Sequence, residues 1–103
     1  PDTRKTFIYN TFEKLMKAIS KSLKKNDPNH LNLGIRYGYI EQLDDELLRI
    51  SKESFDALSF NCYALSPDHE KMNHALEISG LPMIIGEYHF GTVDRGLAHP
   101  CGK

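Results

Sequence analysis

The sequence has few cysteines, little net charge and no long hydrophobic run, and each shortage excludes a class of protein. Cys62 and Cys101 do not make a disulfide framework or a cysteine-rich metal site. A formal net charge of -1 leaves no electrostatic footprint for a nucleic acid. No apolar run approaches the roughly 18 residues of a membrane span. We therefore expect no nucleic-acid partner and no membrane partner.

Two kinds of ligand motif are also missing. Neither G-x-G-x-x-G nor a Walker-type loop occurs, so the sequence does not carry the usual phosphate-binding signatures. The five histidines are scattered, and His69 and His74 are five residues apart rather than at the i, i+4 spacing of helical zinc sites. "HPC" at 99–101 has no partner cluster. We expect neither a cofactor nor a metal ion.

Helices and strands are predicted to alternate along the chain. Apolar residues three and four positions apart predict an amphipathic helix over residues 5–25, which Pro28 terminates. Further helices are predicted over 44–52 and 68–79, and strands over 31–37, 57–63 and 82–88. The strands begin about 25 residues apart, a rhythm typical of a parallel sheet with right-handed crossovers.

This rhythm suits an open doubly wound sheet or a (β/α)₈ barrel. All three predicted strands end in polar or aromatic residues, in "GIRYG", "FNCYA" and "GEYHFG", which is how barrel enzymes build a site. A complete barrel needs about 250 residues, whereas this chain has 103. The predicted fold class is therefore α/β, a partial (β/α)₈ TIM barrel, with residues 1–103 as a single incomplete domain. A small free-standing βα protein is the alternative, although three strands with two open edges make a marginal core.

Glu87 is the strongest candidate for a functional residue. It follows Met83, Ile84 and Ile85, which we expect to form a strand buried on both faces. An unpaired carboxylate at such a position is costly, so Glu87 requires partners or faces a site. Tyr63, at the end of the second strand, could donate a hydrogen bond to it, and Arg36 at the end of the first strand could supply positive charge. The alternative is a structural glutamate–arginine pair.

Other polar residues are expected near Glu87. Asn61 and Tyr63 lie two residues apart, as do Glu87 and His89, so each pair shares one side of an extended strand. The aromatic residues of the strand ends, Tyr37, Tyr88 and Phe90, either stack on a ligand ring or pack at the sheet edge. Cys62 with His89 is a conceivable nucleophile pair, but Cys62 is expected to face away from Asn61 and Tyr63.

Retaining glycoside hydrolysis suits a carboxylate held among such donors. One carboxylate attacks the anomeric carbon while a second carboxylic acid, about 5–5.5 Å away, protonates the leaving oxygen. The first carboxylate must stay ionised, which Tyr and Arg donors favour.

At this point the sequence resembles a family. "PMIIGEYHFGTVDRG" is similar to the nucleophile strand of the retaining TIM-barrel glycoside hydrolases that include β-galactosidases and β-agarases, and is closest to the β-agarase form. "DPNHLNLGIRYG" and "DALSFNCYA" resemble the fifth and sixth strands of that barrel. The resemblance implies that Glu87 is the nucleophile and that Tyr63 is the tyrosine that hydrogen-bonds it. It also implies a C-terminal fragment of the catalytic domain and a secreted or periplasmic protein.

The sequence departs from the family pattern in one important respect. The acid/base glutamate, usually in an Asn-Glu pair after the fourth strand, has no counterpart here. We therefore expect a β-agarase-like fragment acting on a galactose-containing polysaccharide, with catalytic Glu87 and Tyr63 and substrate-binding Arg36, Asn61 and His89. Its other partner would be the rest of the barrel, and the isolated chain is expected to be inactive. The competing hypothesis is a non-catalytic carbohydrate-binding or degenerate barrel protein.

Overall fold

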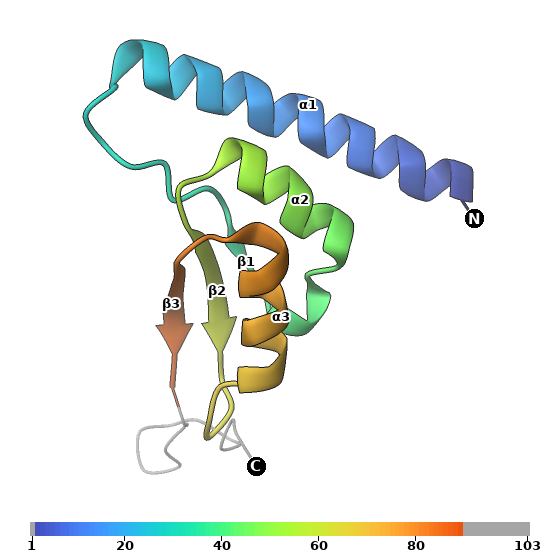
Figure 1. The fold of residues 1–103 in the computed structure, drawn as a ribbon, viewed down its shortest axis with the longest axis vertical. Coiled ribbons are helices and arrows are strands. Elements are labelled where there is room, and N and C mark those ends of the chain that lie inside the picture. The colour runs from blue at the N-terminus through green and yellow to red at the C-terminus, as the bar shows by residue number, and fades with distance from the viewer. Residues whose placement is uncertain (1, 90–103) are drawn as a thin grey trace, which may run out of the picture.

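The computed structural model describes residues 2–89, and it confirms an α/β fold with three parallel strands. The chain order is α1, β1, the 3₁₀ helix η1, α2, β2, α3 and β3, and the sheet order is β1-β2-β3 (Figure 1). The bounds are α1 Asp2–Asn26, β1 Arg36–Tyr37, η1 Ile40–Gln42, α2 Asp45–Ser54, β2 Leu58–Cys62, α3 His69–Ser79 and β3 Met83–Tyr88. Adjacent parallel strands joined through helices are the βα units that the sequence predicted.

The first strand is much shorter than the predicted range 31–37. It contains two residues, because Gly34 takes a left-handed conformation (φ 68°) just before it. Asn32 leaves the sheet and bonds to Asp56 instead: its amide donates to Asp56 Oδ2 at 2.7 Å, and its carbonyl accepts from the Asp56 amide at 2.8 Å. Within residues 2–89, β1 has a neighbour on one side only. The η1 turn after it was not predicted.

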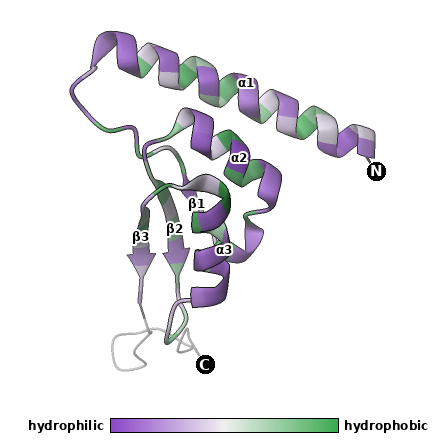
Figure 2. Cartoon of the chain, viewed as in Figure 1, coloured by the Kyte–Doolittle hydropathy of each residue, from purple (hydrophilic) through white to green (hydrophobic). Residues whose placement is uncertain are grey.

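The hydrophobic core lies between one face of the sheet and the helices. Leu48 of α2 and Leu58 and Phe60 of β2 are almost completely buried, and Met83 and Ile85 of β3 pack against this cluster. Figure 1 shows α2 and α3 side by side next to the strands, with α1 lying along α2. Figure 2 shows hydrophobic residues where these elements meet. Full burial of one such side chain is worth about 1.5–3 kcal/mol, so the burial of this layer stabilises the fold.

The opposite face of the sheet is bare in the part of the chain that the structure describes. Ile84, which alternates with Met83 and Ile85, is 40% exposed. The prediction of a strand buried on both faces was therefore wrong for this chain. A parallel strand is buried on both sides only where a second layer covers it, and residues 2–89 place their helices on the face of Leu58 and Phe60.

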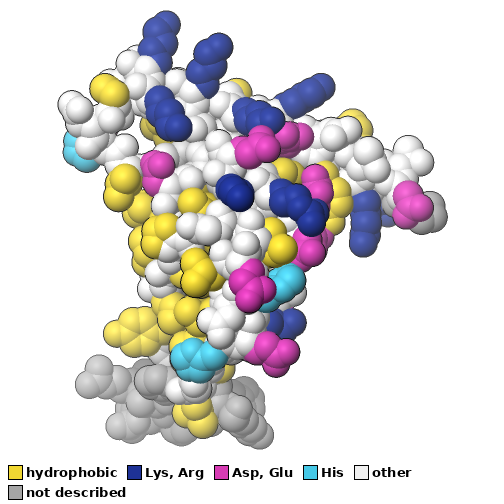
Figure 3. Space-filling view, in the orientation of Figure 1, with side chains coloured by type: hydrophobic (Ala, Val, Ile, Leu, Met, Phe, Trp, Pro, Cys, Tyr) yellow, Lys and Arg dark blue, Asp and Glu magenta, His cyan; other side chains and the backbone are white. Residues whose placement is uncertain are grey.

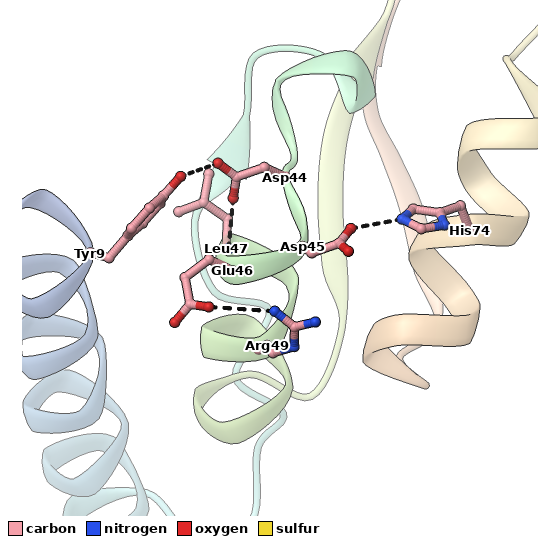
Figure 4. Close-up of polar contacts among 7 residues, drawn as sticks. All are labelled: Tyr9, Asp44, Asp45, Glu46, Leu47, Arg49 and His74. Carbon is pink, nitrogen blue, oxygen red and sulfur yellow. Dashed lines mark hydrogen bonds and ion pairs between the residues drawn. The ribbon is translucent and has the colours of Figure 1, made fainter. Parts of the chain in front are cut away.

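Polar contacts join the three helices (Figure 4). Asp44 caps α2 by accepting from the Leu47 amide at 3.0 Å, and it also accepts a hydrogen bond from the Tyr9 hydroxyl of α1. That hydrogen bond raises the pKa of the Tyr9 phenol. On the other side of α2, the Asp45 Oδ1 atom lies 2.7 Å from the Nε2 atom of His74 in α3. These contacts link α2 to α1 on one side and to α3 on the other.

Part of the predicted apolar face of α1 has no partner in the described residues. Met16 is buried against α2 and Phe12 is half-buried, whereas Ile8, Leu15 and Ile19 are exposed. Figure 3 shows Lys and Arg side chains projecting from α1 and hydrophobic side chains gathered over the strands. None of the described helices is long and apolar enough to cross a membrane.

Candidate functional site

A β-bulge in β3 places Glu87 on the bare face of the sheet. Phe60 pairs with Ile85, but the next residue, Asn61, pairs with Glu87, so Gly86 is an extra residue without a partner in β2. Strict alternation would put Glu87 on the side of Met83 and Ile85, in the hydrophobic core. Because of the bulge, Glu87 instead lies opposite Asn61, on the face away from the helices.

Gly86 itself fills a narrow space on this face. A Cβ at this position would lie 2.8 Å from Ser59 Oγ and 3.0 Å from Arg36 Cδ. Real Cβ atoms essentially never come as close to another atom as the first of these distances. The glycine therefore leaves room for the aliphatic part of the Arg36 side chain, which crosses from β1 over β2.

Arg36 reaches Glu87 from the other edge of the sheet. Its Nη2 atom lies 3.2 Å from Glu87 Oε2, and the two side chains are 53% and 42% exposed. An ion pair this accessible to water contributes little to stability. Its consequence is geometric: a guanidinium from β1 holds a carboxylate of β3 across the intervening strand. The structure thus brings together two of the predicted site residues.

Tyr63 and His89 lie beyond the strand ends and contact each other. Their ring centroids are 4.9 Å apart with planes at 70°, and Tyr39 contacts Tyr63 in the same edge-to-face manner at 6.2 Å. Among residues 2–89 no hydrogen bond joins Tyr63 to Glu87. The role proposed for the Tyr63 hydroxyl therefore stays a prediction. Tyr39 was missed by the sequence reasoning, although it follows β1 by two residues.

The remaining aromatic candidates separate into two groups. Tyr37 is buried in the core with its hydroxyl 2.8 Å from Ser51 Oγ, so it packs and is not placed to stack on a ligand. Burial raises the pKa of its phenol. Tyr88 is 68% exposed, and Phe90 lies outside the described residues.

Cys62 faces away from Glu87, although it lines a cavity at the end of β2 together with Asn61. It pairs with Tyr88 on the face opposite Asn61 and Glu87, and lines an apolar cavity of about 280 Å³ with Leu65 and Ile85. The separation from the Glu87 face agrees with strand alternation. Within the described part of the chain, no three His, Cys, Asp or Glu side chains gather closely enough to hold a metal ion.

Similar proteins were found by sequence. No family model matches the chain. It is 35% identical over 91 residues to beta-agarase B of Vibrio sp. (strain JT0107), an alignment that covers 84% of this chain and 9% of that protein. It is 32% identical over 84 residues to beta-agarase A of the same strain, covering 77% of this chain and 8% of the relative. The chain thus spans about a tenth of the length of the curated relatives it matches.

Similar folds were found among solved structures. The structure of PfGH50B matches with a TM-score of 0.73 and 33% identity, covering 85% of this chain and 12% of that one. The crystal structure of an agarase, AgWH50C, matches with a TM-score of 0.67 and 34% identity, covering 84% and 12%. In sequence and in fold, the chain is therefore similar to one short part of the beta-agarases.

Proposed function

We propose that the chain is part of a retaining glycoside hydrolase of the β-agarase kind, and that its substrate is a galactose-containing polysaccharide. Glu87 is the nucleophile of a double displacement at a β-glycosidic bond. Arg36 and Tyr63 position it, and Asn61 and His89 contact sugar hydroxyls. The observation that carries this proposal is the 3.2 Å contact between Arg36 and Glu87 on the bare sheet face.

The chemistry follows from that position. Glu87 Oε attacks the anomeric carbon from one side while the bond to the leaving sugar oxygen breaks and a carboxylic acid protonates that oxygen. Water then cleaves the glycosyl ester, and the same acid, now a base, takes the proton from the water. The two inversions restore the starting configuration. The acid/base carboxylate would come from a segment before Pro1, since no Asn-Glu pair occurs in this sequence.

The uncovered surfaces support a larger domain. Ile8, Leu15 and Ile19 form a stripe on α1, and β1 is paired on one side only in residues 2–89. Further βα units of a (β/α)₈ barrel would pair with β1, pack on this stripe and enclose the Glu87 face. The similarity to about a tenth of each beta-agarase supports the same interpretation.

Product stereochemistry tests this proposal. The full-length protein that contains this chain should release, from a neutral β-linked galactan oligosaccharide, a new reducing end that is initially β, as seen by ¹H NMR before mutarotation. An initially α product would overturn the double displacement. Binding without any hydrolysis would instead support the non-catalytic carbohydrate-binding alternative.

A further inference from the structure

A second cavity lies beside the candidate site, at the carboxyl ends of β1 and β2. It has a volume of about 390 Å³, which is within the size range of small-ligand sites. Residues after β1 form one wall, and residues from the end of β2 to the start of α3 form the other. The lining combines an apolar part, which includes Phe60 and Cys62, with the polar groups of Tyr39, Glu41, Asn61, Tyr63, Ser66 and Asp68.

The polar groups in this cavity leave acceptors unused. The Asn61 Oδ1 atom is buried and has no hydrogen-bond partner in the described residues. A buried amide oxygen in this state is normally satisfied by a water or a ligand. Asp68 uses Oδ1 to cap α3 through the Lys71 amide at 3.1 Å, which leaves Oδ2 available. Three acceptors in one cavity, counting Glu41, suit a ligand rich in hydroxyl donors.

The aromatic residues add an apolar wall. Tyr39 is 45% exposed and contacts Tyr63 edge to face, so the two rings meet at an angle of 66°. A tyrosine ring at the wall of a cavity offers an apolar face to the C–H groups of a pyranose, while the hydroxyls of the sugar turn to the polar groups.

The charge of the lining indicates which sugar fits. Glu41 and Asp68 carry negative charge, and no Lys, Arg or His is among the described lining residues. An anionic ring, such as a sulfated sugar, would be repelled by two carboxylates with no cation to balance it. A neutral hexose meets no such penalty.

We propose that this cavity is a subsite for a neutral hexose ring of the polysaccharide, with Tyr39 as the stacking residue and Glu41, Asn61 and Asp68 as hydroxyl acceptors. This inference rests on the proposed function, since it places the subsite next to Glu87, the partner of Asn61 across the sheet. It goes further in naming residues that select against sulfate esters.

Binding to the full-length protein carrying Glu87→Gln tests the subsite without consuming the ligand. The probes are a neutral agarose hexasaccharide and its chemically sulfated form, titrated by calorimetry. Tyr39→Ala is expected to raise the Kd of the neutral probe about tenfold, whereas Tyr39→Phe leaves it within about twofold. The double variant Glu41→Gln/Asp68→Asn is expected to lower the Kd of the sulfated probe about fivefold. Asn is as good a helix cap as Asp, so α3 is preserved.

Glu77→Gln is the matched control, because Glu77 lies on α3 and outside the cavity lining. It should change neither Kd. Unchanged Kd values in the Tyr39→Ala and Glu41→Gln/Asp68→Asn proteins would overturn the subsite. They would not affect the assignment of Glu87 as nucleophile, which covalent labelling tests separately. Tighter binding of the sulfated than of the neutral probe to the parent would also overturn it. Failure of the parent to bind either probe would overturn both proposals.

Discussion

Replacing Glu87 by Gln in the full-length protein is expected to lower kcat on a β-linked galactan by a factor on the order of 10⁴ or more. The amide has the shape of the carboxylate and can still accept a hydrogen bond from Arg36 Nη2, which lies 3.2 Å from Glu87 Oε2. It cannot form the glycosyl ester. Initial rates of reducing-end release measure this effect, and circular dichroism checks that the fold is retained.

Chemical rescue separates a lost nucleophile from a damaged site. In Glu87→Gly, added azide can enter the vacated space and attack the anomeric carbon, so the expected product is an α-glycosyl azide from a β-glycoside. Glu77 is an exposed carboxylate on α3, so the control variant Glu77→Gln should keep the parent rate. A Glu87→Gln protein with activity within tenfold of the parent would contradict the assignment.

Replacing Gly86 by Ala is expected to lower kcat by a factor on the order of 10², because a displacement of about 1 Å at a reacting group can cost that much. The new Cβ would meet Ser59 Oγ at 2.8 Å and Arg36 Cδ at 3.0 Å. The Ser59 side chain, the Arg36 side chain or β3 must move, and the last two hold Glu87. The effect should appear in kcat more than in KM, since the neighbouring cavity is not altered.

A second variant tells steric displacement from general destabilisation. Ser59→Ala removes the nearer of the two atoms and, alone, should leave kcat close to that of the parent. Combined with Gly86→Ala, it should recover part of the lost kcat. If Gly86→Ala keeps the parent kcat, or if Ser59→Ala makes the double variant no better than the single, the bulge does not position Glu87 as described.

The sequence was sufficient to predict the elements with strong periodicity. Apolar spacing and the terminating Gly80 placed α3, and the apolar run before Glu87 placed β3, each to within one residue of the observed bounds. The first strand was overestimated, because apolar residues at 31, 33 and 35 look like a strand but have no neighbour to pair with in residues 2–89. Pairing is a tertiary property that the alternation of residues does not encode.

The sequence predicted which residues belong to the candidate site better than it predicted how they are arranged. Strand ends identified Arg36 and Glu87 as neighbours, and the structure joins them. The bulge at Gly86 could not be deduced, because a glycine inside a strand is compatible with either a bulge or a plain weakening of the strand. Tyr39 was missed because it lies between β1 and the 3₁₀ helix η1, which was not predicted, and only the fold brings it beside Tyr63.

Covalent trapping tests the central claim most directly. The full-length protein would be incubated with a 2-fluoro galactoside that carries a good leaving group, which slows breakdown of the glycosyl ester, and then digested and mapped by mass spectrometry. A retaining enzyme with Glu87 as nucleophile should gain one fluoroglycosyl group, on the peptide that contains β3 and on Glu87 itself. A label on any other carboxylate, or hydrolysis of the natural substrate with no label trapped, would contradict the account.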